Sequence, residues 1–291
     1  MIEPDICVYH GNCADGFGAA FAVWTKHGEE CHYIAGKYDE PPQADDIIEV
    51  FRDKEIVFVD FCWKRDVMEA IADVAAGLVI IDHHKSAAEL ISDLTARPNV
   101  GCLFDLERSG AMLAWQYFHP DERIPRLFQH IQDRDLWKFE LEYTREIQAC
   151  VFSYPYDFDV WNELVQRCDR NAVELIKEGQ VLERKHFKDI KEFLDATDGW
   201  LRIEGHRIPA LNVPYMWSSD ACQMLLGKYP DAPFSACYWK TRTGWQFSLR
   251  SDKNTDNFDV SEIAKKFGGG GHHNASGFTI PRHRFHLFHD V

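Results

Sequence analysis

Short apolar runs that stop abruptly at a polar residue recur in the first third of the chain. Three such runs, each with the residue that ends it, are Ile6–Tyr9 before His10, Ile56–Val59 before Asp60, and Leu78–Ile81 before Asp82. Continuous apolar runs of this length are typical of strands buried on both faces. A further strand is expected at His32–Ala35.

Helical patterns separate these runs. Residues 17–26 are rich in alanine, 65–76 and 123–132 alternate with helical periodicity, and Ser109 is a plausible helix cap. Strands that alternate with helices predict a parallel sheet, in which the polar residues at the strand ends gather along one edge.

The pattern changes in the second half of the chain. Residues 161–196 have helical periodicity with an expected break near Gly179, and a turn follows at 195–199. Shorter segments come next: strands at 201–203 and 208–212, helices at 219–226 and 260–267, and a hairpin made of 234–239 and 245–250. We therefore expect an α/β protein of two domains, divided as 1–160, a helical connector 161–198, and 199–291.

Composition narrows the class of protein. The net charge of −15 disfavours long duplex nucleic acid as a partner, since that would require a basic face. Nine singly scattered cysteines suit reduced thiols and not a disulfide framework. No apolar run approaches the length of a membrane span, and the first residues lack a signal peptide pattern. We expect a cytoplasmic protein without a membrane partner.

Acids and imidazoles that the pattern places at the strand ends form the candidate chemistry. They are His10, Asp15, Asp60, Asp82, His83, His84 and Asp133. Carboxylate oxygens with neutral imidazole suit Mn²⁺ and, less selectively, Mg²⁺, Co²⁺ or Zn²⁺. Two such ions can activate water and stabilise charge on a phosphate, with Asp60 as the candidate bridge. Taken singly, Asp15 could be only a helix cap and Asp133 only a solvated charge.

A second candidate site lies near the end of the chain. The glycines Gly268–Gly271 precede His272 and His273, and consecutive glycines let backbone N–H groups converge on an anion. Arg250 ends a predicted strand and could fork onto a phosphate. The alternative is a flexible loop with a helix stop at Gly268.

These motifs resemble, in order and spacing, those of the DHH phosphoesterase family and its companion DHHA1 domain, the group of nanoRNase and RecJ-like phosphodiesterases. The matching segments are His10–Gly16, Val57–Asp60, Ile80–His84, Asp133–Trp137 and Gly268–Ser276. The resemblance covers nearly the whole chain. It implies an N-terminal DHH domain with helices on both faces of a parallel sheet, a smaller C-terminal α/β DHHA1 domain, and a cleft between them.

The resemblance also implies roles for residues. His10, Asp15 and Asp60 would hold one metal ion, and Asp60, His83 and Asp133 the other. His84 would contact the phosphate or protonate the leaving group, and Asp82 would orient an imidazole. The substrate's far phosphate or terminal nucleotide would bind to Arg250, Gly269, Gly270, Gly271, His272 and His273. We expect Mn²⁺, as one or two ions, with Mg²⁺ or Co²⁺ possible.

One position departs from the family pattern. The first motif usually carries a second Asp two residues after the first, and Phe17 stands there instead, after one inserted residue. One metal would then lack a protein ligand, which water, Asn12 or Asp135 could replace. Phe17 would be an apolar wall, a base-stacking face or simply core.

The predicted function is a metal-dependent phosphodiesterase, an oligoribonuclease-like enzyme that hydrolyses short oligonucleotides or linear dinucleotides such as pGpG to mononucleotides. Alternatives are a hydrolase of cyclic dinucleotides, of 3′-phosphoadenosine phosphate or of longer single-stranded DNA. A catalytically weak nucleotide sensor is another alternative, supported only by the missing acid at Phe17. We expect a short nucleotide as the partner, and a homodimer is possible.

Overall fold

A computed structural model describes residues 2–38, 40–252 and 258–288. These residues divide into two compact units, Met1–Glu183 and Arg184–Val291, and the division falls within one helix, α9 (Val173–Ala196). The predicted domain limits at 160 and 198 remain a prediction. No helix among the described residues is long and apolar enough to cross a membrane.

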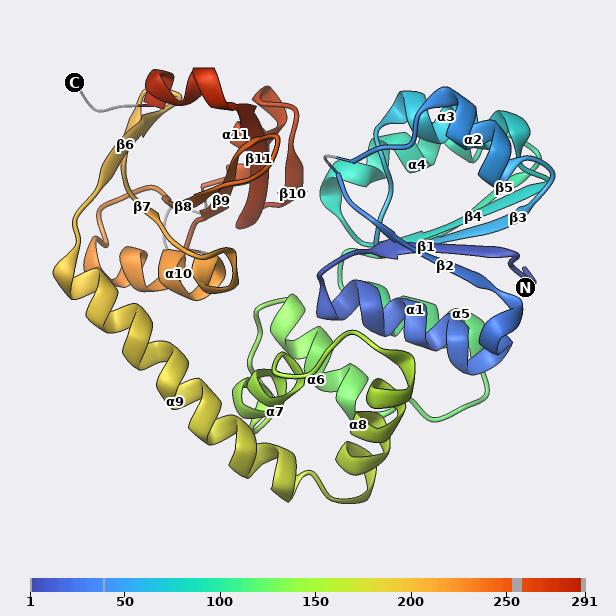
Figure 1. Cartoon of the computed structure of the whole chain (residues 1–291), viewed down its shortest axis with the longest axis horizontal. Helices are drawn as coiled ribbons and strands as arrows, with labels where there is room; N and C mark the ends of the chain where they lie inside the picture. Colours follow the sequence, from blue (N-terminus) through green and yellow to red (C-terminus); the bar gives the residue numbers. More distant parts are fainter. Residues whose placement is uncertain (1, 39, 253–257, 289–291) are drawn as a thin grey trace. The chain divides into compact units, whose positions relative to one another are not determined.

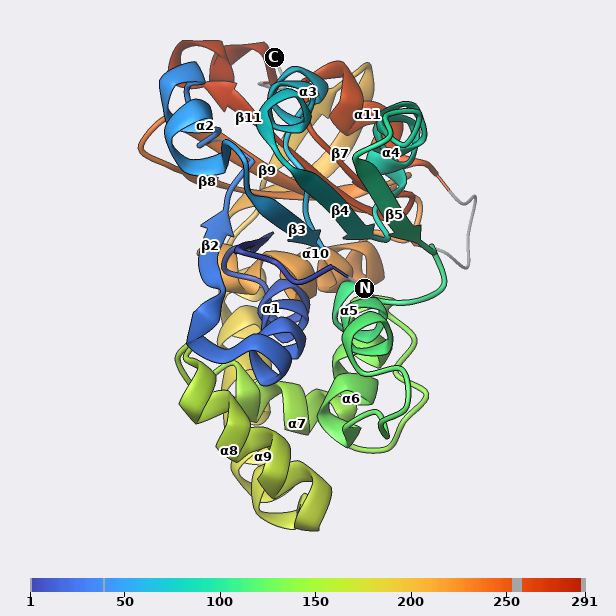
Figure 2. The same ribbon diagram turned by 90° about the vertical axis from the view of Figure 1, so that its right-hand side faces the viewer.

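The N-terminal unit is built on a five-stranded parallel sheet in the order β2-β1-β3-β4-β5. Its strands are β1 (Ile6–His10), β2 (His32–Gly36), β3 (Glu55–Val59), β4 (Gly77–Asp82) and β5 (Val100–Phe104). The four predicted strands are confirmed. Strand β5 was not predicted, because it is half exposed at the sheet edge and lacks a continuous apolar run. Figure 2 shows the arrows of β3, β4 and β5 running in one direction.

Helices cover both faces of this sheet, as the pattern predicts (Figure 1). On one face lie α1 (Ala14–His27) and α5 (Gly110–Phe118); on the other lie α2 (Ala44–Phe51), α3 (Arg65–Val74) and α4 (Ala88–Leu94). Side chains of β3 alternate between the two cores, since Val57 and Val59 pack on the first face, and Ile56 and Phe58 on the second. Burial on both faces explains why the central strands are apolar throughout.

The rest of this unit is helical. It contains α6 (Arg126–Asp135), α7 (Thr144–Val151), α8 (Phe158–Asn171) and the first half of α9. The break expected near Gly179 is wrong, because the chain breaks at Ala172 and α9 runs on through Gly179. Glycine is needed there for another reason: a Cβ would lie 1.8 Å from the carbonyl oxygen of Glu146, so α7 and α9 touch at this point.

The C-terminal unit holds a six-stranded sheet in the order β10-β11-β9-β8-β7-β6. Its elements are β6 (Trp200–Ile203), β7 (His206–Asn212), α10 (Ser218–Lys228), β8 (Ser235–Lys240), β9 (Gly244–Arg250), α11 (Val260–Lys266), β10 (Gly270–His272) and β11 (Ala275–Pro281), with short 3-10 turns η3 (Tyr215–Trp217) and η4 (Arg282–Phe288). Helix α10 packs on one face and α11 on the other. The predicted α/β class and the hairpin of β8 and β9 are confirmed.

Candidate metal centre

Asp60 lies directly after β3, at the carboxyl edge of the parallel sheet. Its side chain is 1% exposed, and its backbone φ of 56° lies in the left-handed region that residues other than glycine seldom adopt. Gly110 permits this position, because a Cβ on Gly110 would lie 2.4 Å from the Cβ of Asp60. A buried carboxylate on a strained backbone is a frequent feature of functional sites.

Two groups of potential metal ligands share Asp60. One contains His10 and His84, the other contains Asp15 and His83, and the ligand atoms within each group lie within 4.8 Å of one another. His83 Nε2 lies 3.1 Å from Asp60 Oδ1, and His10 Nδ1 lies 3.4 Å from Asp60 Oδ2. Each oxygen of Asp60 therefore faces a different imidazole, which is the arrangement that a carboxylate bridging two ions requires.

Several polar atoms of this cluster are buried without a hydrogen bond among the described residues. They include both carboxylate oxygens of Asp60, Oδ2 of Asp135 and Nδ1 of His10. A buried polar atom left without a partner costs about 1–3 kcal/mol. A divalent cation would supply the missing partner, and this mixture of carboxylate and imidazole suits Mn²⁺, Mg²⁺ or Co²⁺. The residues present therefore fit a metal centre.

Asp15 is held by the start of α5. The backbone N–H groups of Gly110 and Ala111 donate to its two carboxylate oxygens at 2.6 and 3.0 Å, where the helix dipole favours negative charge. Its Oδ2 lies 3.4 Å from His83 Nε2. The structure therefore groups Asp15 with His83, whereas the family pattern led us to expect it with His10.

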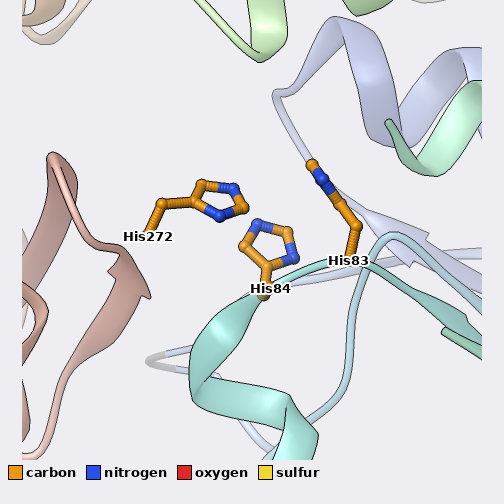
Figure 3. A group of neighbouring side chains, drawn as sticks. All are labelled: His83, His84 and His272. Carbon is orange, nitrogen blue, oxygen red and sulfur yellow. The ribbon is translucent and has the colours of Figure 1, made fainter. Parts of the chain in front are cut away.

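Asp82 organises the two histidines that follow it. Its Oδ1 accepts the backbone N–H groups of His83 and His84 at 2.7 and 3.0 Å and contacts His84 Nδ1 at 2.7 Å. A carboxylate that only accepts requires the proton on Nδ1, so Nε2 of a neutral His84 carries the lone pair. Figure 3 shows the rings of His83 and His84 pointing in different directions after β4; the figure also draws His272, which belongs to the C-terminal unit. The orienting role predicted for Asp82 matches this geometry.

The charges of the cluster shift its protonation. Burial lowers the pKa of His83, but Asp60 and Asp135 outweigh burial and raise this pKa well above its ordinary value. Burial raises the pKa of Asp15, and the neighbouring Asp60 and Asp135 raise it further. For Asp60, burial is outweighed by His10 and His83, which hold its pKa well below the usual range. Without a cation, the cluster therefore retains protons that a cation would displace.

Asp133, predicted as a metal ligand, is placed elsewhere. Its Oδ1 accepts the backbone N–H of Glu140 at 2.8 Å, and its Oδ2 accepts the backbone N–H of Leu141 at 3.1 Å and the hydroxyl of Thr144 at 2.6 Å. Both oxygens are committed to the loop between α6 and α7. The structure thus corrects this assignment: Asp133 anchors a loop and does not join the cluster around Asp60.

Asp135 takes the place expected for Asp133. Its Oδ2 lies 3.5 Å from His83 Nε2, and burial together with the charge of Asp60 raises its pKa. The sequence offers both acids, but helix geometry separates them, because residues two apart on a helix are turned by about 200°. Only one of the two acids can therefore face the sheet edge. The two-residue spacing of Asp133 and Asp135 on a predicted helix was the sequence signal for this.

Phe17 is a core residue. It is 2% exposed, its ring stacks on Phe158 with centroids 4.9 Å apart, and it meets the edge of Trp161 at 4.9 Å. The side chain has no exposed face for a nucleobase. Asp135, one of the expected replacements for the acid missing at this position, lies near His83.

In the C-terminal unit, Arg250 and His272 lie on one face of the sheet. Both pair with Ala275 of β11, Arg250 from β9 and His272 from β10, so all three side chains form one row across three strands. Arg250 donates to Ser219 Oγ at 2.7 Å and to Ser248 Oγ at 3.0 Å. Nothing in the sequence pattern pointed to Ser219 and Ser248, which fix the guanidinium.

The glycines Gly268–Gly271 belong to a helix end and a strand, and not to a flexible loop. The N–H groups of Gly268 and Gly269 donate to the Lys265 and Ala264 carbonyls of α11, so they terminate that helix. Gly270, Gly271 and His272 form the edge strand β10. His273 lies apart from this row, with Nδ1 3.1 Å from the Asp259 carboxylate. Of the predicted residues in this unit, Arg250 and His272 are therefore the ones that the strand register places together.

Comparisons with known proteins identify the family of this chain. The DHHA1 domain family matches residues 218–290. An uncharacterized protein of Acanthamoeba polyphaga mimivirus is 32% identical to this chain. The alignment covers 96% of this chain and 68% of the viral protein. The chain belongs to the DHH/DHHA1 phosphoesterase family.

Solved structures share the fold of this DHH/DHHA1 protein. The DHH domain of a protein described as a member of a family of ribosomal proteins superposes with a TM-score of 0.60 at 14% identity, covering 98% of this chain and 84% of that chain. RecJ of Thermus thermophilus, solved in complex with Mn²⁺, superposes with a TM-score of 0.50 at 14% identity, covering 97% of this chain and 50% of RecJ. At these identities the likeness concerns the fold.

Proposed function

We propose that this DHH/DHHA1 protein is a metal-dependent phosphodiesterase that hydrolyses short oligonucleotides or linear dinucleotides such as pGpG to mononucleotides. The observation that carries the proposal is the pair of ligand groups sharing Asp60, whose buried oxygens make no hydrogen bond among the described residues. One ion would bind to Asp15, Asp60, His83 and Asp135, and the other to His10 and Asp60. Bound there, Mn²⁺ or Mg²⁺ would activate water and neutralise charge on the phosphate.

The chain's own residues supply orientation and proton transfer. Asp82 holds His84 through Nδ1, which leaves Nε2 to contact the phosphate or, when protonated, to donate to the departing oxygen. Asp15 is fixed by the start of α5, so its carboxylate needs little reorganisation when a cation binds. The face formed by Arg250, Ala275 and His272 is proposed to bind a phosphate or terminal nucleotide of the substrate.

Short substrates are favoured by charge. A chain with a net charge of −15 gains little from a long polyanion, whereas one metal centre and one arginine suffice for one or two phosphates. The alternative of a catalytically weak nucleotide sensor rested on the missing acid at Phe17; the core position of Phe17 and the place of Asp135 near His83 favour the enzyme instead.

A substrate panel with Mn²⁺ tests the proposal. We would compare pGpG, cyclic di-GMP, 3′-phosphoadenosine phosphate, a five-nucleotide RNA and a twenty-nucleotide single-stranded DNA, separating products by chromatography. The expected result is mononucleotides, released fastest from pGpG and the five-nucleotide RNA. Asp60→Asn controls for contaminating nuclease, and exposed Asp66→Asn controls for loss of an acid elsewhere. Intact pGpG bound without turnover would contradict the enzyme assignment, and fastest cleavage of the twenty-nucleotide DNA would contradict the length preference.

A further inference from the structure

A pocket separate from the candidate metal centre lies in the N-terminal unit, among the starts of helices α6, α7 and α9 (labelled in Figure 1). Its volume is about 350 Å³, within the range of ligand sites in proteins. Both polar side chains, such as Arg126, His130 and Glu142, and apolar side chains, such as Leu141 and Val173, line it. None of the residues proposed to bind metal lines this pocket.

The apolar part is unusually exposed for its residue types. Leu141, Tyr143 and Val173 are 41%, 47% and 47% exposed, and all three line the pocket. Tyr143 has a left-handed backbone with φ of 65°, and among the described residues its ring meets no other aromatic ring. Exposed apolar side chains gathered around a hollow mark a binding site more often than an empty surface, and an open tyrosine face suits a planar ring.

His130 is the polar group of the pocket with the most specific geometry. It is 6% exposed, its Nδ1 lies 2.9 Å from Thr144 Oγ1, and its Nε2 has no hydrogen-bond partner among the described residues. Thr144 already donates its hydroxyl proton to Asp133, so its oxygen must accept from His130 Nδ1–H. Nε2 of the neutral imidazole is therefore an acceptor, and His130 lines the pocket. Burial favours this neutral form because it lowers the pKa of His130.

The remaining polar groups define what could bind. Arg126 is exposed, lines the pocket, and its guanidinium makes no hydrogen bond or ion pair with the described residues. Glu142 contributes a carboxylate, which accepts hydrogen bonds. Together the pocket offers a cation for an anionic group, two acceptors for ring N–H groups, and an aromatic face for a planar base.

We propose that this pocket binds a purine nucleoside monophosphate and that binding there strengthens the metal centre. The base would stack on Tyr143 with its N–H groups directed to Glu142 and His130, and the phosphate would pair with Arg126. This inference rests on the proposed function, because mononucleotides are its proposed products. Binding in the pocket would then let a product regulate the enzyme.

The route from pocket to metal centre is a short chain of bonds. Leu141 and Tyr143 form one wall of the pocket, and the backbone N–H of Leu141 and the hydroxyl of Thr144 both donate to Asp133. Asp133 lies two residues before Asp135 in the last turn of α6. A ligand that fixes this wall also fixes the helix end that carries Asp135, and the coupling must act equally in the reverse direction.

Hydrogen exchange on metal-free, full-length protein tests the binding site. GMP is expected to slow exchange in residues 140–144, and guanosine or inorganic phosphate alone should have a smaller effect. Arg126→Gln and Tyr143→Ala should each weaken GMP binding by about tenfold, the equivalent of about 1.4 kcal/mol, while exposed Arg123→Gln should not. Equal binding in Arg126→Gln and Arg123→Gln would overturn the site, and equal protection by inorganic phosphate would overturn the nucleotide assignment.

Calorimetric titration of Mn²⁺ with and without GMP tests the coupling. GMP should tighten Mn²⁺ binding by about fivefold, at the lower end of typical couplings. Thr144→Val should abolish this effect, because it removes the hydroxyl that links Asp133 to His130, whereas Thr144→Ser, which keeps the hydroxyl, should retain it. If Tyr143→Ala retains the effect, GMP acts at the metal centre and the coupling is refuted. A chain that binds GMP at 140–144 yet leaves pGpG intact would refute the proposed function alone.

Discussion

The proposed metal centre draws its residues from two regions, the strand ends of the parallel sheet and the end of α6, which position them by different means. His10, Asp60 and His83 are placed by the parallel sheet, whose strands end side by side. Asp135 lies in the last turn of α6, just before a loop in which Trp137, Phe139 and Tyr143 all have positive φ values, 55°, 52° and 65°. Regular structure fixes the first set, whereas the hydrogen bonds of Asp133 to the loop fix the second.

The largest effect is expected for the residue that both ligand groups share. Asp60→Asn removes a charged ligand from each group, so phosphodiesterase activity should fall by more than the roughly 100-fold that loss of an orienting partner can cost. The variant should remain folded, because asparagine has nearly the same shape. Steady-state kinetics with pGpG and Mn²⁺, alongside thermal unfolding, provide the measurement. Activity near that of the wild type would remove Asp60 from the metal centre.

The pair Asp135→Asn and Asp133→Asn tests the loop directly. Asp135→Asn should lower Mn²⁺ affinity by about 100-fold with little change in stability. Asp133→Asn should lower the free energy of unfolding by about 1–3 kcal/mol, because its amide nitrogen cannot accept a hydrogen bond from the loop. Calorimetry with Mn²⁺ and chemical denaturation separate the two. The reverse pattern, with Asp133→Asn the more damaging to Mn²⁺ affinity, would restore Asp133 as the ligand.

This contrast also explains what could be read from the sequence. The strand-end residues follow apolar runs, and a parallel sheet necessarily gathers the ends of those runs at one edge. The identity of Asp135 depends on which side of α6 faces the sheet and on left-handed residues such as Phe139, which have no local sequence signature. Similarly, Gly179 looked like a helix break, because the sequence does not show that Glu146 passes close to it.

In the C-terminal unit, too, the sequence predicted the elements but not which side chains they bring together. The hairpin of β8 and β9 was predictable from two strand-like segments joined by a turn at Thr243-Gly244, and it placed Arg250 at a strand end. The row formed by Arg250, Ala275 and His272 depends on the register of β11 between β9 and β10, which no pattern in the glycine run specified. Sequence therefore identified the residue types of both sites, and strand register and loop geometry decided the members.

A smaller effect is expected at Asp82, which holds the His84 ring and is not among the proposed metal ligands. Asp82→Asn keeps the shape but weakens the contact to His84 Nδ1 and permits the other tautomer of the ring. Activity on pGpG should fall by about 10- to 100-fold, with the pH profile of kcat displaced. The matched exposed variant Asp66→Asn should behave as the wild type. A loss as large as that of Asp60→Asn would mean that Asp82 binds metal directly.

The smallest effect is a pH dependence of metal affinity that involves both sets of residues. His83, Asp15 and Asp135 all have raised pKa values, so each binds protons that Mn²⁺ must displace. Affinity should therefore rise as pH increases from about 6 to about 8, by about tenfold for each proton released per pH unit. Calorimetry in two buffers of different ionisation enthalpy counts those protons. In Asp135→Asn the neighbouring negative charge that raises the pKa of His83 is gone, so fewer protons should be released. An affinity independent of pH would show that no proton is displaced and would place the bound ion away from His83.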